Sequence, residues 1–182
     1  MTEPVVQRGM PSVASLVSTI AELLSDSPAL SRGDLSALRR MDPRRPEPPF
    51  FKIEALVLEE WLPGEAAARA DLETRWSAIT CGLAHLGVLH RPGLRLGNVL
   101  AEADWSDVRF ARLVRADADR LADDLPALAR FLEAKSIPVD WTGAAQMILS
   151  AGTPHEEDVR RHIARDYYGT LARKAQQGKG AK

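Results

Sequence analysis

Apolar residues recur at intervals of three and four along most of the chain, and this spacing predicts helices. Leu16, Ile20, Leu23 and Leu24 show it first, because they fall on one face of a helix. The pattern predicts helices over residues 13–24, 32–41, 50–61, 65–85, 94–103, 106–118, 121–135, 141–150 and 154–174. No segment indicates a strand. The predicted fold class is all-α, a compact bundle of eight to nine helices.

Capping residues and prolines set the predicted boundaries of these helices. Ser31, followed three residues later by Asp34, is typical of a helix start, and so is Asp140 before Trp141. The run Thr153-Pro154-His155-Glu156 predicts a capping box with proline at the first helical position. Pro126 predicts a helix start near Asp124, with the proline in the first turn. Four prolines in residues 42–49 predict a loop, and residues 90–93 predict a turn.

The length of 182 residues fits one domain. We expect a flexible start over residues 1–11, a single all-helical domain over 12–174 and a disordered tail over 175–182. The helical domain has room for two lobes, which would meet near residue 104.

The composition agrees with the helical pattern. The chain has 27 Ala and 23 Leu but only 10 aromatic residues, a balance that favours helices over a β-sandwich. Its single cysteine, Cys81, excludes an internal disulfide and a cysteine zinc site, so we expect an intracellular, cytoplasmic protein. No run of about 20 apolar residues exists, so no membrane span is expected.

The charges cancel in sum but are segregated along the sequence. The 24 basic and 25 acidic residues give a net charge of −1, which excludes a uniformly basic nucleic-acid binder. Five arginines against two aspartates give residues 32–45 a charge of +3, and seven basic against two acidic residues give residues 158–182 a charge of +5. Arg outnumbers Lys by 19 to 5, and its planar guanidinium group suits phosphate.

Two predicted helices carry arginine opposite an apolar face. At about 100° per residue, Arg109, Arg112 and Arg115 fall on the side opposite Phe110 and Leu113. In the last helix, Arg161 and Arg165 lie opposite the stripe that contains Val159, Ile163, Tyr167 and Leu171. Such a face either binds phosphate or is an ordinary solvated surface.

Other reactive groups give weaker signals. His85, His90, His155 and His162 lack the spacing of a metal site, so we predict no metal and no cofactor. Asp117, Asp119, Asp123 and Asp124 are typical of helix caps and dipole partners rather than of a catalytic cluster. Cys81 lies in an apolar helix, which indicates a packed thiol rather than a nucleophile. A metal-dependent hydrolase is therefore disfavoured.

Four blocks, in order along the chain, resemble a known family. They are Ser31-Arg-Gly-Asp-Leu-Ser-Ala-Leu-Arg-Arg40, Val108-Arg-Phe-Ala-Arg-Leu-Val114, Val139-Asp-Trp141 and Val159-Arg-Arg-His-Ile-Ala-Arg-Asp-Tyr-Tyr168. Together they make the chain similar to the CasB small subunit of the type I-E CRISPR effector complex, Cascade, over about residues 12–174. Ile163, where an aromatic residue is more usual, and the proline-rich segment 42–49 depart from the family pattern.

The resemblance implies a helical, non-catalytic subunit of a ribonucleoprotein that acts in antiviral defence. It implies two copies beside the crRNA-bearing backbone subunits and the large subunit, with basic surfaces that hold the crRNA, the target DNA and the displaced strand. By position, the resemblance assigns nucleic-acid binding to Arg32, Arg39, Arg40, Arg109, Arg112, Arg160, Arg161 and Arg165, and the helical face adds Arg115. Arg39 and Arg160 could equally make structural ion pairs.

A helical DNA-binding transcription regulator is the alternative function. It would need a helix-turn-helix with a tight turn and a dimer interface. The proline-rich segment 42–49 interrupts the first helices where such a turn would lie. Protection of a discrete duplex site by the isolated protein would favour this alternative.

Overall fold

The computed structural model describes residues 11–26 and 28–180, and these residues form a helical bundle. The predicted flexible start lies outside the described residues except for Pro11, and residues 181 and 182 of the predicted tail also lie outside them. The helices are α1 (Val13–Asp26), α2 (Arg32–Arg40), α3 (Pro48–Ile53), α4 (Ala66–Leu86), α5 (Leu96–Glu102), α6 (Asp107–Arg115), α7 (Ala118–Ala134), α8 (Thr142–Ser150) and α9 (Glu156–Gly180). A π-helical turn (Glu54–Leu58) and 3₁₀ turns (Glu59–Trp61 and Gly87–Leu89) complete them.

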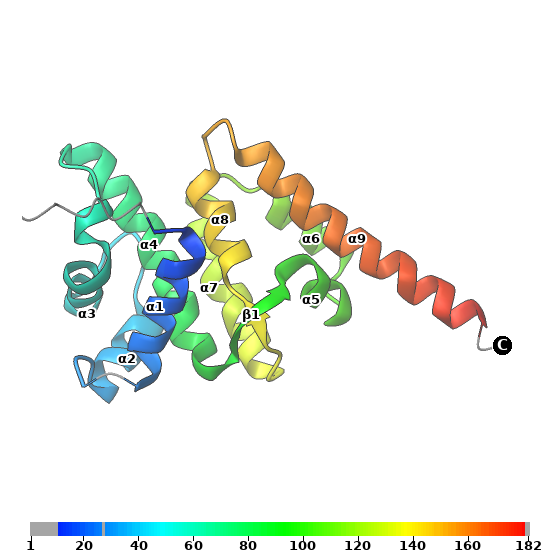
Figure 1. Cartoon of the computed structure of the whole chain (residues 1–182), viewed down its shortest axis with the longest axis horizontal. Helices are drawn as coiled ribbons and strands as arrows, with labels where there is room; N and C mark the ends of the chain where they lie inside the picture. Colours follow the sequence, from blue (N-terminus) through cyan, green and yellow to red (C-terminus); the bar gives the residue numbers. More distant parts are fainter. Residues whose placement is uncertain (1–10, 27, 181–182) are drawn as a thin grey trace, which may run out of the picture.

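The helices are arranged along the long axis of the molecule (Figure 1). Helices α1 to α4 lie at one end, α5, α6 and α9 at the other, and α7 and α8 between them. The most extensive helix pairs are α4 with α7 and α5 with α9. The buried apolar side chains form one continuous cluster, to which both ends contribute. The predicted all-α class is confirmed.

Trp141 fixes the centre of the bundle. Its ring is fully buried against Gly82 of α4, where a Cβ atom would lie 2.7 Å from Cε2 of the ring. The indole Nε1 donates a hydrogen bond to the Ile79 carbonyl oxygen at 3.2 Å. A glycine is therefore needed at position 82, because only a bare backbone lets the ring approach α4 so closely.

Helix α9 holds α5 and α6 at the other end. Gly97 of α5 lies directly against the α9 backbone, so that a Cβ atom there would lie 2.9 Å from the Tyr167 nitrogen. Phe110 of α6 stacks on Tyr167, with ring centroids 3.7 Å apart and planes 4° apart. The Tyr167 hydroxyl donates to the Trp105 carbonyl oxygen at 2.5 Å and lies 3.0 Å from Asp107 Oδ1. Burial, followed by the hydrogen bond to Asp107, raises the pKa of Tyr167 to about 12.

The helix boundaries agree with the capping signals at two positions. Ser31 and Asp34 make the reciprocal capping box of α2, in which each side chain accepts a backbone N–H. Asp140 Oδ1 accepts from the Thr142 backbone at the start of α8. Both cases depend on a side chain and a backbone only a few residues apart, which is why local sequence predicts them.

Several boundaries differ from the predictions, and four of them have a clear local cause. Helix α3 begins at Pro48, because prolines are tolerated in a first turn where no N–H bond is needed. Helix α7 begins at Ala118 and runs through Pro126, because Asp117 accepts from the Arg120 N–H and caps it earlier than expected. The predicted capping box at Thr153 is wrong, because helix α9 begins at Glu156 and the carboxylate of Glu156 accepts from the Gly152 N–H rather than from that of Thr153. The helix continues to Gly180, past Lys174, because alanine and glutamine favour helix.

The prediction of no strand is wrong at one position. Residues His90–Arg95 form β1, which pairs in parallel with β2 (Val139–Asp140) and contains an irregularity between its two bridges. Pro92 and Gly93 indicated a turn, and a pairing with residues so distant in sequence leaves no local pattern. No helix among the described residues has the length and apolar character that a bilayer crossing needs.

Candidate nucleic-acid interface

Helix α6 presents a row of arginines to solvent. Phe110 and Leu113 are 1% and 3% exposed and anchor the helix to the core. Arg109, Arg112 and Arg115 are all exposed on the other side. We call these three residues the α6 stripe. The structure confirms the two faces that helical periodicity predicts for this segment.

The α6 stripe has no compensating acid within the part of the chain that the structure describes. None of its three guanidinium groups forms an ion pair there. Arg109 lies over the Trp105 ring, 5.4 Å from its centroid, in a cation–π contact that leaves its charge available. The carboxylate of Asp107, at the start of α6, is directed to the Tyr167 hydroxyl. The stripe is therefore a concentration of positive charge on one helix face.

The arginines of α9 divide into two kinds. Arg161 and Arg165 are exposed, Arg161 in a pair with Glu157 at 3.0 Å and Arg165 without an ion pair among the described residues. Arg160 is turned inward, with a side chain only 18% exposed. Its Nη2 donates to the Ala116 carbonyl oxygen at 2.6 Å and also pairs with Glu156. Arg160 therefore ties α9 to the end of α6, as the structural reading of that residue predicts.

The arginines of α2 lie at the opposite end of the molecule from α6 and α9 (Figure 1). Arg32 is exposed, and Arg40 donates to the Ser36 hydroxyl at 2.9 Å. Arg39 Nε donates to the Ala84 carbonyl oxygen at 2.8 Å, near the end of α4. This contact is a hydrogen bond to the backbone rather than the ion pair considered from the sequence. The nine candidate arginines thus form two separate groups and not one site.

Most carboxylates near these helices are already engaged. Asp117 caps α7, Asp124 pairs with Arg120, and Asp123 pairs with Arg44 at 2.6 Å, which holds the proline-rich loop against α7. The predicted capping role is therefore confirmed for Asp117, whereas Asp123 and Asp124 form ion pairs instead. Among the residues described, no three His, Cys, Asp or Glu side chains form a group that could hold a metal ion.

Cys81 is a buried thiol, as predicted. Its side chain is packed in the core, and it lies 3.9 Å and 4.0 Å from the carbonyl oxygens of Arg39 and Met41. Burial raises the pKa of the thiol to about 11, which disfavours the nucleophilic thiolate at neutral pH.

A comparison with protein families identifies the chain. The family model described as CRISPR-associated protein Cse2 matches residues 34–168, which is most of the sequence. The chain belongs to the Cse2 family. This family supplies the small subunit of the type I-E Cascade complex in CRISPR defence, and it is a structural component of that complex. No curated protein and no solved structure matched the chain.

The Cse2 match includes all the candidate arginines of α6 and α9. Of the nine, only Arg32 lies before the matched residues. Sequence reasoning missed a groove between α8 and α9, whose lining includes His155, Asp158 and His162. Its one sequence signal is the spacing of Asp158, His162 and Asp166 at i, i+4 and i+8, which places them on one helix face.

Proposed function

We propose that this Cse2-family protein binds the sugar-phosphate backbone of crRNA and target DNA within Cascade, without reading base sequence. The α6 stripe is the observation that carries the proposal, because three exposed arginines that form no ion pair with any described residue attract phosphate. The protein acts without catalysis, in the cytoplasm, and stabilises the R-loop in antiviral defence. Its partners are crRNA, target DNA and the displaced strand, the backbone and large subunits of Cascade, and a second copy of itself.

The geometry of α6 suits a phosphate backbone. Arg109 and Arg115 are six residues apart, which corresponds to about 9 Å along a helix axis. Consecutive phosphates of one duplex strand advance by about 3.4 Å along its axis, so the stripe can reach two or three of them. Guanidinium groups bind phosphate oxygens through two parallel hydrogen bonds. Contacts of this kind position a strand but carry no sequence information.

The exposed arginines of α9 and α2 are the remaining candidates in this proposal. Arg165 is the stronger candidate on α9, since Arg161 already has a carboxylate partner. Arg32 and Arg40 form a second group at the far end of the molecule. Arg160 is largely buried against its backbone acceptor, so we assign it no phosphate. Arg39 is exposed and uses only its Nε in the hydrogen bond to Ala84, so it remains a candidate of the α2 group.

The test is the double reversal Arg109→Glu with Arg112→Glu in the assembled complex. DNA is titrated into the complex at several salt concentrations. Loss of two phosphate contacts should weaken binding and reduce the salt slope by about 1.4–1.8, since each contact contributes about 0.7–0.9. Both side chains are exposed, so the fold tolerates the change. Unchanged affinity and slope would refute the role of the stripe.

A matched control separates a local contact from a change of net charge. Arg91→Glu with Arg130→Glu makes the same charge change at two exposed arginines outside the candidate set. This variant should keep most of the salt slope. An equal loss in both variants would mean that only the total charge of the subunit matters.

Co-purification tests the assembly part of the proposal. When neighbouring subunits are tagged, the chain should be recovered with them and with a discrete small RNA. DNA protection by the isolated protein tests the transcription-regulator alternative. We expect no discrete footprint, because α2 and α3 are joined by a seven-residue loop rather than by the tight turn of a helix-turn-helix.

A further inference from the structure

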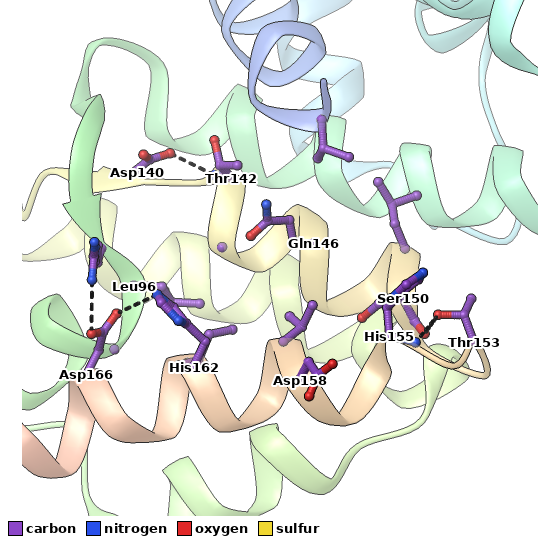
Figure 2. Close-up of a pocket in the computed structure, with 17 residues that line it drawn as sticks. Leu96, Asp140, Thr142, Gln146, Ser150, Thr153, His155, Asp158, His162 and Asp166 are labelled. Carbon is purple, nitrogen blue, oxygen red and sulfur yellow. Dashed lines mark hydrogen bonds and ion pairs between the residues drawn. The ribbon is translucent and has the colours of Figure 1, made fainter. Parts of the chain in front are cut away.

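A groove of about 730 Å³ runs between α8 and α9 (Figure 2). Its Asp158 lies one helical turn before Arg161, so the exposed arginines of α9 flank this edge of the groove. Residues of β1 and β2 and the start of α5 line one part of it, and Val13 of α1 also lines it. The groove is open to solvent and has the size of sites that bind small molecules or a few side chains.

Much of the groove surface is apolar. Leu149 of α8 and Val159 of α9 are only partly buried, and Leu96 and Ile163 complete the apolar lining. Burial of such surface contributes about 25 cal/mol per Å² to an association. Apolar side chains of a ligand would therefore be bound here in preference to water.

The charged groups of the groove are mostly acidic. Asp140, Asp158 and Asp166 line it together with a single arginine, Arg95, for a formal sum of −2 with neutral histidines. Asp166 lies 3.4 Å from Arg95 and 3.8 Å from His162, and Asp140 accepts backbone N–H groups of Gly93 and Thr142. Asp158 is exposed and has no partner among the described residues. Among the acidic residues that line the groove, Asp158 is therefore the carboxylate that remains available to a cation.

We propose that this groove binds a segment of another polypeptide of the complex, in which an apolar side chain lies next to a lysine or arginine. The apolar side chain occupies the surface of Leu149, Val159 and Ile163, and the cationic group pairs with Asp158. The negative sum of the lining charges favours such a segment over nucleic acid. The groove proposal does not depend on the α6 stripe.

Site-specific photo-crosslinking tests the nature of the partner. Benzoylphenylalanine replaces Gln146, an exposed residue that lines the groove, in the full chain within the assembled complex. We expect a crosslink to another protein subunit, and mass spectrometry should place it next to a lysine or arginine in an apolar segment. The same probe at Arg112 should crosslink to nucleic acid. A groove crosslink to nucleic acid, to a second copy of this chain or to an acidic segment, or no crosslink, would overturn the proposal.

A charge reversal tests the role of Asp158. Asp158→Lys and Glu60→Lys make the same charge change at two exposed carboxylates that have no ion pair among the described residues, but only Asp158 lines the groove. The measurement is the affinity of each variant for a complex assembled from the other subunits and crRNA. We expect Asp158→Lys to weaken binding about tenfold, the size of a lost ion pair plus a new repulsion, and Glu60→Lys to have a much smaller effect. Equal effects, or none, would overturn the assignment.

Discussion

The close contact between α5 and α9 predicts that Gly97→Ala lowers the free energy of unfolding. An alanine Cβ at this position would lie 2.8 Å from Asp166 Cβ and 2.9 Å from the Tyr167 nitrogen, and closer still to the Ile163 carbonyl oxygen. Carbon atoms pack at about 3.5–4.0 Å, so the two helices must separate by roughly 0.6 Å or more. Two of the three obstructing atoms belong to the α9 backbone and cannot rotate away.

The expected magnitude combines two opposing effects. Overpacking a core costs about 1–3 kcal/mol, and a rigid backbone obstacle places this site in the upper half of that range. Alanine favours the helix more than glycine does, and this difference in helix propensity stabilises the variant by at most about 1 kcal/mol. The free energy of unfolding should therefore fall by about 1–2 kcal/mol. For a chain of this size, that loss lowers the Tm by roughly 2–8 °C.

The matched control is Gly33→Ala, which is also at the second residue of a helix. There the nearest atom to the new Cβ is the Ser31 hydroxyl oxygen at an ordinary 3.5 Å. This variant should be as stable as the parent or slightly more so. Urea and thermal unfolding followed by circular dichroism measure both proteins. Equal stabilities of the two variants would refute the close approach of α5 and α9.

Three further predictions concern single side chains. Arg160→Ala should lower the free energy of unfolding by about 1.5–3 kcal/mol because a charged hydrogen-bond donor is lost, whereas Arg165→Ala should change urea unfolding by less than about 0.5 kcal/mol. Because the pKa of Tyr167 is raised from 10 to about 12 in the folded protein, the stability that its protonated hydroxyl supplies is complete below pH 10 and is lost as the pH rises to about 12. In Tyr167→Phe, the free energy of unfolding should therefore depend less on pH over that range. Ellman's reagent should detect the Cys81 thiol only after unfolding, and rapid reaction of the native protein would contradict its burial.

The predictable part of the interface depends on short-range geometry. Within the nine residues of α6, the positions of Phe110 and Leu113 decide which side is buried and therefore where Arg109, Arg112 and Arg115 lie. No tertiary contact is needed for that inference. The same reasoning holds for Ser31, which caps α2 through a residue three positions away.

The remaining features depend on partners that leave no sequence signal. Arg160 and Arg39 bind the carbonyl oxygens of Ala116 and Ala84, which are 44 and 45 residues away along the chain. Every residue has a carbonyl group, so no residue type marks such an acceptor. Helix periodicity can show that an arginine leaves the core, but only the tertiary structure shows whether it is still available to a ligand. The groove was missed for a related reason, since α1, β1, β2, α5, α8 and α9 all contribute to it.

The separation of the exposed arginines into two groups affects how a nucleic-acid strand would bind to the protein. Arg32 and Arg40 on α2 and the α6 stripe lie at opposite ends of a bundle with one continuous core, so the distance between the groups is fixed. Once one group holds a nucleic-acid strand, the encounter of the other group with the same assembly is intramolecular and occurs at a high effective concentration. Under the proposed function, two individually weak contacts then act together as one bivalent contact. Shortening the strand so that it no longer spans both groups would remove the gain in avidity without altering a single arginine.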